Sequence, residues 1–272
     1  MPTWRLLIHG PESAAWNMAV DESIAIHCAR GLAVPTLRFY QWQPAAVSLG
    51  RHQPASDIDL QRLQALGWGL VRRPTGGRAI LHTDELTYSL SGPATHPLFQ
   101  GPVLNVYNRI SQGLLLGLQR LGVQAIKAPG SQRTARDVSA ACFEVPSAYE
   151  ISVGRKKLIG SAQRRAQGFV LQHGSLPLHG DITRLVEVMH FDDEAQRSAF
   201  RTHLAARATT LEAALGRRVS FYEAATLLLG GLNTALDVDF GLGDLSPPEL
   251  ALAQEIQNQK YASVTWTDMK KG

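Results

Sequence analysis

Apolar residues recur along this chain at two spacings, one of three to four residues and one of two residues, which separate predicted helices from predicted strands. The clearest helical pattern covers residues 103–121, where six apolar side chains fall on one face: Val103, Val106, Ile110, Leu114, Leu118 and Leu121. Gly113 and Gly117 lie within this pattern, and we expect them to allow close approach to a sheet. Two further helices are predicted at residues 14–29, with Ser13 as N-cap, and 58–66.

The two-residue spacing predicts strands. Residues 85–90, Glu-Leu-Thr-Tyr-Ser-Leu, alternate polar and apolar side chains, which is typical of a half-buried strand. Short runs rich in strand-forming residues predict the other strands at 4–9, 35–40, 46–49, 68–71, 79–81, 123–127, 149–153, 157–161 and 168–178.

From about residue 192 the pattern changes to helices, predicted at 194–206 and onward from Ser220 and Ser246. Ser220 with Glu223 and Ser246 with Glu249 match the capping-box pattern of a helix N-terminus. This change divides the chain into a predicted catalytic domain at 1–191 and a helical C-terminal extension at 192–272.

Composition limits the class of protein. With 272 residues, 44% of them hydrophobic, the chain can bury a large core as one domain, or as one domain with an appendage. No apolar run approaches the ~20 residues of a membrane span, and the N-terminus lacks the pattern of a signal peptide. We therefore expect no membrane association and a cytoplasmic location. A net charge of +4, spread along the chain, gives little support for nucleic-acid binding, and an acidic protein partner is at least as plausible.

Cysteine and histidine residues suggest little metal chemistry. The two cysteines, Cys28 and Cys142, are too few for a disulfide framework. Cys28 shares a helical stripe with Met18 and Ile24, so we expect it to be a core residue. No His-x-x-x-His motif or Cys/His cluster is present, and no metal is expected.

A basic turn stands between the predicted strands at 68–71 and 79–81. It contains Arg72, Arg73 and Arg78, with Gly76 and Gly77 between them. Adjacent glycines allow a ligand to contact bare backbone, and the arginines supply charge and directional donors. The alternative is a β-hairpin turn with solvated arginines. The spacing does not match a P-loop or a dinucleotide-binding loop.

Cys142 follows a polar stretch rich in small residues, and Lys157 comes fifteen positions later across a predicted hairpin. A thiolate is the nucleophilic form of cysteine, and a nearby ammonium lowers the pKa of the thiol. This pair is therefore a candidate nucleophile with its activating group. The alternative is a buried small residue beside a solvated lysine.

Several motifs occur together and in order: Asn17-Met18-Ala19 with Asp21-Glu22, the 72–82 turn, Ala141-Cys142-Phe143-Glu144, Lys157-x-x-Gly160-Ser161 and Gln172-His173-Gly174-Ser175. The combination resembles the biotin and lipoate protein ligase superfamily, most closely its cysteine-dependent octanoyltransferases of the Gram-positive type. The resemblance covers roughly residues 3–190. It implies an α+β fold with a mixed, largely antiparallel sheet, packed helices and a small helical C-terminal appendage.

The resemblance also implies a reaction. Such enzymes move an octanoyl group from octanoyl-acyl carrier protein to their own cysteine, then to a lysine of a lipoyl domain, such as the glycine-cleavage H protein. Cys142 would carry the acyl thioester, Lys157 would lower its pKa, and no ATP or other cofactor would be needed. Backbone N–H groups near Gly76, Gly77 or Gly160 could stabilise the oxyanion. The implied substrate-binding residues are Arg72, Arg73, Gly76, Gly77, Arg78, His82, Gly160, Ser161, His173 and Gly174.

Three other functions stay open. An ATP-dependent lipoate ligase shares Arg72, Arg73, the glycine pair and Lys157, but such ligases usually have a third glycine where this chain has Arg78. An amidotransferase would move octanoyl between two lipoyl domains and also uses a cysteine. A non-catalytic sensor would only bind a lipoyl or octanoyl group.

Overall fold

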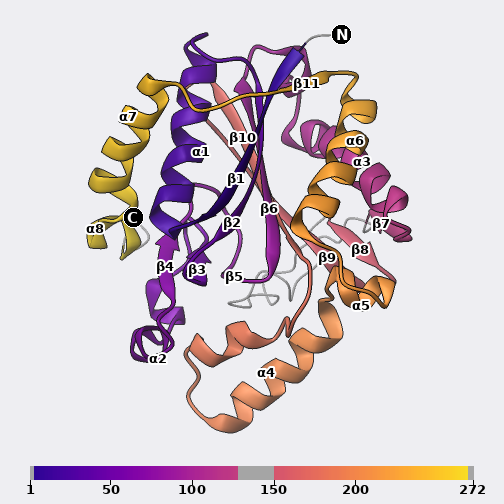
Figure 1. Cartoon of the computed structure of the whole chain (residues 1–272). Coiled ribbons are helices and arrows are strands. Elements are labelled where there is room, and N and C mark those ends of the chain that lie inside the picture. Colours follow the sequence, from indigo (N-terminus) through magenta and orange to yellow (C-terminus); the bar gives the residue numbers. More distant parts are fainter. Residues whose placement is uncertain (1–2, 128–149, 269–272) are drawn as a thin grey trace.

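The computed structural model describes residues 3–127 and 150–268 (Figure 1). Within these ranges the strands form an eight-stranded sheet and a three-stranded sheet. In spatial order, the large sheet contains β11 (Asp239–Leu242), β1 (Thr3–Glu12), β2 (Thr36–Trp42), β6 (Glu85–Pro93), β10 (Phe169–Pro177), β9 (Lys156–Ala166), β8 (Ile151–Val153) and β7 (Ala125–Lys127). The small sheet contains β4 (Gly69–Arg72), β3 (Ala46–Leu49) and β5 (Ile80–His82).

The large sheet is mixed and mostly antiparallel. Strand β1 runs parallel to both β2 and β11, and every other neighbouring pair is antiparallel. The helices are α1 (Ala14–Ala29), α2 (Leu60–Ala65), α3 (Val103–Arg120), α4 (Glu194–Arg207), α5 (Leu211–Leu215), α6 (Phe221–Leu236), α7 (Pro247–Ile256) and α8 (Val264–Thr267). The predicted α+β fold is therefore confirmed.

The two faces of the large sheet differ in chemistry, as strand β6 shows. Its Leu86, Tyr88 and Leu90 belong to the main hydrophobic core, to which α3 and α6 also contribute. Its Thr87 and Ser89 instead hydrogen-bond to groups on β2 and α1. Figure 1 shows α1 on one side of the sheet and α3 with α6 on the other. One face is thus an apolar core, and the other is a buried polar layer.

Glycines on α3 allow contact with another helix. A Cβ atom at Gly113 would lie 2.8 Å from the Leu232 Cα atom, and one at Gly117 would lie 2.6 Å from the Leu228 Cα atom, both on α6. We had predicted that these glycines face a sheet, and that prediction was wrong. The periodicity identified the buried side of α3 but could not identify its neighbour, because α6 is more than one hundred residues away in sequence.

The basic turn does not form a hairpin. Strands β4 and β5, which flank it, both pair with β3, which lies between them. Arg72 and Arg73 are 0% and 3% exposed, so they are not solvated. The alternative interpretation of a hairpin with solvated arginines was therefore wrong.

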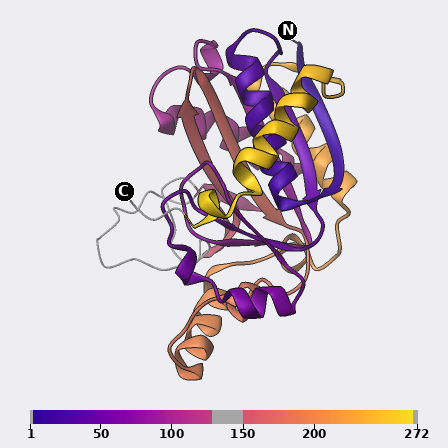
Figure 2. The same cartoon turned by 90° about the vertical axis from the view of Figure 1, so that its left-hand side faces the viewer.

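The residues after 191 pack on the preceding part of the chain and share its sheet and core. Strand β11 pairs with β1, and α6 belongs to the main core. Helix α7 packs along α1 (Figure 2), and its buried Glu249 accepts hydrogen bonds from Arg5 at 2.5 and 2.7 Å. The helical extension thus shares the sheet and core of the catalytic part, and the division at residue 191 stays a prediction.

The helix ends follow their sequence signals in most cases. Helix α1 covers the predicted residues 14–29, and the Ser13 side chain accepts from the Trp16 N–H group. Ser246 and Glu249 form the predicted capping box. At α6 only half of the box is present, because Ser220 accepts from the Glu223 N–H group while the Glu223 carboxylate pairs with Arg217. Strand β11 and helices α5 and α8 were not predicted. None of the described helices is both long and apolar enough to cross a membrane.

The contact between α3 and α6 gives a stability test. Alanine has a higher helix propensity than glycine by about 1 kcal/mol, so a Gly→Ala change within a helix is intrinsically favourable. We expect Gly117→Ala to lower the free energy of unfolding by about 1–3 kcal/mol nevertheless, because the new methyl group would overlap backbone atoms of α6. Urea denaturation measures this change.

The matched control is Gly230→Ala on α6. A Cβ atom there would meet only the end of the Arg120 side chain, which can move away. We expect this variant to be as stable as the wild type or more stable. Equal loss of stability in both variants would contradict the close-packing explanation.

Candidate functional site

A buried carboxylate on α1 forms the centre of the polar layer. Asp21 is 0% exposed and accepts hydrogen bonds from Arg38 Nη1 at 2.9 Å, Ser89 Oγ at 2.7 Å and Tyr40 Oη at 2.8 Å. Burial by itself raises the pKa of Asp21, but the neighbouring His173 and the charge of Arg38 outweigh it, so the pKa lies below its ordinary value. Asp21 is therefore a carboxylate anion held under the sheet.

Arg38 on β2 balances this charge. Its guanidinium is fully buried and donates to Asp21, to Asn17 Oδ1 at 2.7 Å and to His9 Nδ1 at 2.9 Å. The Arg38 Cζ atom also lies 3.9 Å from the centroid of the Tyr40 ring, over its face. The guanidinium is planar and rigid, and its N–H groups donate to acceptors on α1 and β1. Arg38 therefore fixes the position of α1 relative to β1 and β2.

His173 on β10 lies between Asp21 and the basic turn. Its Nδ1 atom is 3.8 Å from Asp21 Oδ2, and its Nε2 atom is 2.6 Å from Thr75 Oγ1. Burial lowers the pKa of His173, while Asp21 acts in the opposite direction and Arg73 and His82 add to the lowering. The imidazole is therefore neutral near pH 7, with both ring nitrogens directed at protein groups.

His82 on β5 forms a second polar cluster. Its Nδ1 atom lies 2.7 Å from Glu85 Oε1, and its Nε2 atom lies 2.7 Å from Ser48 Oγ. The ring stacks on Trp42 at a centroid distance of 3.9 Å. Glu85 also accepts from the hydroxyl groups of Thr87 and Ser175. This cluster joins the small sheet to β6 and β10.

The donors of Arg72 and Arg73, which we predicted to bind substrate, are directed at backbone carbonyls. Arg72 donates to the carbonyl oxygens of Gly50, Arg51 and Gln53 on one side and of Trp266 and Thr267 on the other. Arg73 donates to the carbonyl oxygens of Ser48, Gly76 and Arg78. These bonds hold the turn and the C-terminal helix α8 in place, and substrate binding by either arginine stays a prediction.

The turn itself presents bare backbone. Gly76 and Gly77 are exposed, and a Cβ atom at Gly76 would meet nothing within 4 Å. Gly77 has a φ of +99° and lies so close to Gly50 that a Cβ atom on Gly50 would come within 1.9 Å of the Gly77 carbonyl oxygen. One side of the turn thus contacts Gly50, just after the end of β3, and the other side is exposed at Gly76.

Lys157 lies on β9 and is 3% exposed. Its ammonium pairs with the carboxylate of Glu150, which is 4% exposed. Cys142, the predicted nucleophile, lies outside the described residues. Farther along β9, Ser161 Oγ lies 2.7 Å from Tyr88 Oη, and Gly160 and Ser161 pair in register with Ser175 and Gly174 of β10.

Gly174 is required by packing. A Cβ atom there would lie 2.5 Å from Ser161 Oγ and 2.6 Å from Tyr88 Cε1. The other cysteine, Cys28, is 1% exposed, and burial raises the pKa of its thiol to about 12. The prediction that Cys28 is a core residue is therefore confirmed, and its thiol is protonated and inert at neutral pH.

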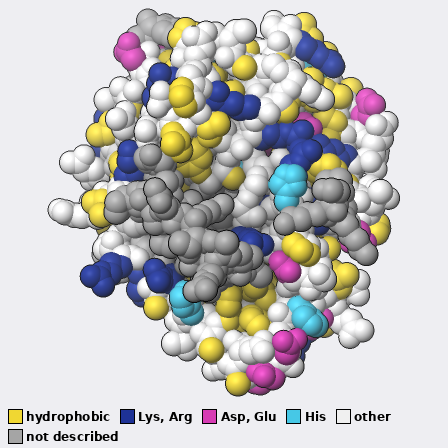
Figure 3. All heavy atoms as spheres, turned by 180° about the vertical axis from the view of Figure 1, so that it is seen from behind, with side chains coloured by type: hydrophobic (Ala, Val, Ile, Leu, Met, Phe, Trp, Pro, Cys, Tyr) yellow, Lys and Arg dark blue, Asp and Glu magenta, His cyan; other side chains and the backbone are white. Residues whose placement is uncertain are grey.

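The C-terminal residues close one side of the site. Lys260 Nζ lies 2.6 and 2.8 Å from the two carboxylate oxygens of Glu22 and 4.4 Å from the ring centroid of Trp266. Burial lowers the pKa of Lys260, and the charges of Arg164 and Arg51 add to the lowering, while Glu22 opposes it. Seen from behind the view of Figure 1, Lys and Arg side chains gather to the right of the centre of the molecule (Figure 3).

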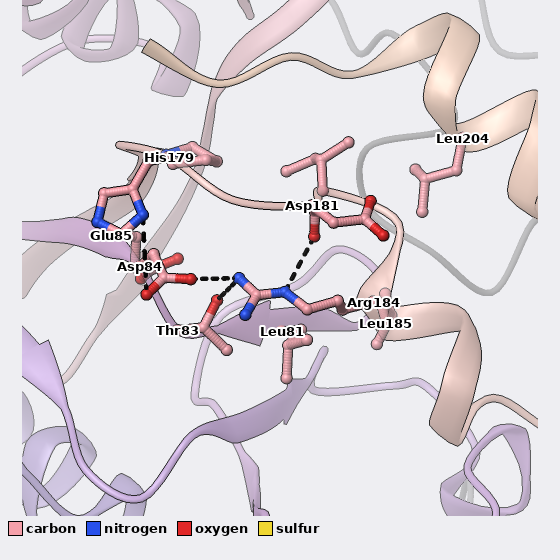
Figure 4. A pocket seen from close by; sticks show the side chains of 11 residues that line it. Leu81, Thr83, Asp84, Glu85, His179, Asp181, Arg184, Leu185 and Leu204 are labelled. Carbon is pink, nitrogen blue, oxygen red and sulfur yellow. Dashed lines mark hydrogen bonds and ion pairs between the residues drawn. The ribbon is translucent and has the colours of Figure 1, made fainter. Parts of the chain in front are cut away.

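A small cavity of about 30 Å³ lies beside the His82 cluster, between the turn before β6 and α4 (Figure 4). Arg184 Nη2 donates to Asp84 at 2.5 Å and to Thr83 at 2.7 Å, and His179 Nδ1 lies 3.9 Å from Asp84. Leu81, Leu185 and Leu204 line its apolar part. It has room for one or two water molecules and not for an acyl chain.

Sequence analysis missed several residues of the polar layer: Arg38, Tyr40, Thr75, Glu85 and Ser89. A signal for two of them was present, because Glu85 and Ser89 lie at alternating positions of the strand that we predicted to be half-buried. The polar face of that strand is covered by α1 and the small sheet, so it is buried as well. Thr75 lies inside the turn that we selected, but its partner His173 is 98 residues away.

Comparisons with known proteins give a consistent result. The sequence model of the family described as Lipoyl protein ligase A/B catalytic domain matches residues 13–233. Octanoyltransferase LipM of Kyrpidia tusciae is 42% identical, covering 99% of this chain and 100% of that protein. Octanoyltransferase LipM of Carboxydothermus hydrogenoformans is 39% identical, covering 98% of each chain.

Two solved structures share the fold over nearly the whole chain. A bipartite lipoate protein ligase from Thermoplasma acidophilum has a TM-score of 0.82 at 24% identity, covering 100% of this chain and 99% of that chain. Lipoate-protein ligase A bound with ATP has a TM-score of 0.79 at 25% identity, covering 98% of this chain and 99% of that chain.

The bond between Arg38 and His9 gives a pH test. Burial and the charge of Arg38 lower the pKa of His9 from 6.5 to about 4. Between these values the unfolded chain binds a proton at His9 that the folded chain does not, so His9 destabilises the fold increasingly as the pH falls from 6.5 towards 4. We expect His9→Gln, which keeps an acceptor for Arg38 but does not titrate, to show a shallower loss of unfolding free energy over this range. Equal slopes in urea denaturation series at pH 4 to 7 would contradict this expectation.

Proposed function

The chain belongs to the lipoyl protein ligase A/B catalytic-domain family and, within it, to the octanoyltransferases, and we propose that it transfers octanoyl from acyl carrier protein through a thioester on Cys142. The acceptor is a lysine of a lipoyl domain, because the reaction belongs to lipoate biosynthesis. The glycine-cleavage H protein is the acceptor we propose first.

The buried ammonium of Lys157 is the structural observation that carries this proposal. Taking an ammonium out of water costs several kcal/mol, and pairing with a carboxylate such as Glu150 offsets part of that cost. A surface lysine would avoid the cost, so a buried lysine paired with Glu150, eight positions after Cys142 in the sequence, is a candidate functional group. Its proposed role is to stabilise the thiolate of Cys142.

The proposed reaction has two steps. In the first, the Cys142 thiolate attacks the carbonyl carbon of the octanoyl thioester, a new carbon–sulfur bond forms, and the thiolate of the carrier leaves. In the second, the lysine amine attacks the Cys142 thioester, an amide forms, and the Cys142 thiolate leaves. This is covalent catalysis with ping-pong kinetics, and the energy of the thioester makes ATP unnecessary.

The remaining site residues take substrate roles in this proposal. Gly76, Gly77 and Gly160 are the candidates for backbone N–H groups that stabilise the oxyanion of each tetrahedral intermediate. Arg78, His82, Ser161, His173 and Gly174 complete the predicted pocket with Arg72 and Arg73. We also propose a cytoplasmic location, because a reducing compartment keeps the nucleophilic thiol free.

Mass measurement of the intact protein tests the nucleophile. After mixing with octanoyl-acyl carrier protein, without ATP, we expect the wild type to gain one octanoyl group and Cys142→Ser to gain none. Cys28→Ala is the matched control, because the buried Cys28 thiol is inert, and it should gain the group like the wild type.

Three outcomes would move the proposal to another function. A requirement for ATP and free lipoate would favour a ligase, which the similarity to the ATP-bound lipoate-protein ligase A keeps as the second candidate. Acylation by an octanoyl-lipoyl domain but not by the carrier protein would favour an amidotransferase. Binding of octanoyl or lipoyl groups without any transfer would favour a sensor.

A substitution of Lys157 tests its role. In Lys157→Ala the thiol should titrate at an ordinary value near 8.5 or above, and acylation at pH 7 should slow by roughly tenfold or more. Alkylation rates measured between pH 5 and 10 report the titration of Cys142, to which Cys28 does not contribute because its pKa is about 12.

The control is Lys156→Ala on the same strand, since Lys156 is exposed and donates to the Ala205 carbonyl oxygen. It should keep the wild-type rate and titration. The double variant Lys157→Ala/Glu150→Gln removes the buried carboxylate charge and should still be slow. If it recovers the wild-type rate, Lys157 only neutralises Glu150.

A further inference from the structure

We propose that Thr75, with His173 and Asp21 behind it, takes up the proton that the acceptor amine loses when the amide forms. This inference rests on the proposed two-step transfer and assigns a group to its second step. Thr75 would contact the amine, and His173 and Asp21 would act through it as positioning residues.

His173 connects the other two side chains. Its Nδ1 atom faces Asp21 Oδ2 at 3.8 Å, and its Nε2 atom lies 2.6 Å from Thr75 Oγ1. We assign the proton of the neutral imidazole to Nδ1, because that nitrogen faces a carboxylate, which only accepts hydrogen bonds. Nε2 is then an acceptor, and Thr75 donates its hydroxyl proton to it. Thr75 Oγ1 can in addition accept a hydrogen bond from a donor such as an amine.

The charges around His173 suit a proton acceptor. Asp21 of α1 faces its Nδ1 atom, and the charges of Arg73 of the turn and His82 of β5 also act on the ring. Burial lowers the pKa of the ring, so it is unprotonated at neutral pH and available as a base, while the Asp21 carboxylate stabilises the imidazolium that forms. This arrangement of acid, imidazole and hydroxyl is the one that other enzymes use to remove a proton from a hydroxyl group.

The contacts from Asp21 through His173 lead to Thr75, which precedes the exposed glycines of the turn. Thr75 is 1% exposed, but the next two residues, Gly76 and Gly77, are exposed, and there is free space above Gly76. In the His82 cluster, Ser48 Oγ is buried and also accepts from Arg73 Nη1 at 3.1 Å. Of the two histidines of the polar layer, His173 is the one that contacts Thr75, the neighbour of the exposed Gly76.

The two steps of the reaction differ in their need for a base. In the first step one thiolate replaces another, and no proton has to move. In the second step a neutral amine becomes an amide and must lose one proton. That proton passes to Thr75 Oγ1, while the Thr75 hydroxyl proton passes to His173 Nε2. The carbon–nitrogen bond forms, the carbon–sulfur bond breaks, and the imidazolium later releases its proton to water.

Measuring each step separately tests this assignment. The first step is followed by the mass of the acyl-enzyme, and the second by mixing purified acyl-enzyme with a lipoyl domain in a single turnover. We expect Thr75→Val to keep the first rate within about twofold and to slow the second roughly a hundredfold, as removal of a general base does. Thr75→Ser, which restores the hydroxyl, should recover most of the second rate.

The pH dependence separates this role from a structural one. The wild-type rate of the second step should fall as the pH is lowered through the pKa of His173, and this inflection should be missing in Thr75→Val. The matched control is Thr36→Val, because Thr36 is equally buried and its hydroxyl donates to the Val34 carbonyl oxygen at 2.9 Å, away from the turn. It should leave both rates and the pH profile unchanged.

Several outcomes would overturn the inference. The first is equal slowing of both steps in Thr75→Val. The second is an unchanged rate of the second step in that variant. The third is a pH inflection of the second-step rate that persists in Thr75→Val. If Thr75→Val does not fold, His173→Gln takes its place, since glutamine fills similar space but cannot take up the proton. Failure of the wild type to form an acyl-enzyme at all would instead contradict the proposed function.

Discussion

The buried ion pair between Asp21 and Arg38 is the constraint on which the rest of the site depends. Two charges that are both excluded from water cost several kcal/mol each unless every donor and acceptor is paired. Here Ser89, Tyr40 and His173 complete the shell of Asp21, and they come from three different strands. The pair therefore fixes α1 against β2, β6 and β10 in one arrangement, because any slip would leave a charge unpaired.

This constraint divides the large sheet into two faces with different tasks. The apolar face packs against α3 and α6 and supplies most of the hydrophobic burial. The polar face carries His173 and Glu85, which meet Asp21 of α1 and His82 of the small sheet. Asp21, His82 and Glu85 each make two or more hydrogen bonds to other elements, and His173 bonds to Thr75 of the turn. The apolar contacts of one face and the polar contacts of the other thus come from different residues, and both hold helices on the sheet.

Much of the fold could be predicted from the sequence, because periodicity and caps are local. Helix α1 matches its prediction at both ends, and the core position of Cys28 follows from its stripe. The direction of a side chain depends on partners far away in sequence, and there prediction was weaker. Arg72 and Arg73 were identified as important, but their acceptors include the carbonyl oxygens of Gly50 and Thr267, which no local pattern indicates. For the same reason Thr75 could not be linked to His173.

Position 78 shows that the fold of the turn and the chemistry it presents have separate origins. Arg73 holds the turn through the backbone carbonyl oxygens of Gly76 and Arg78, so these bonds do not depend on the side chain at position 78. By the resemblance, we expect a ligase to have a glycine there, which would leave space for the nucleotide that activates a free carboxylate. The proposed transfer starts from an activated thioester, so an arginine at this position is compatible with it. The side chain at position 78 can therefore differ without loss of the bonds that hold the turn.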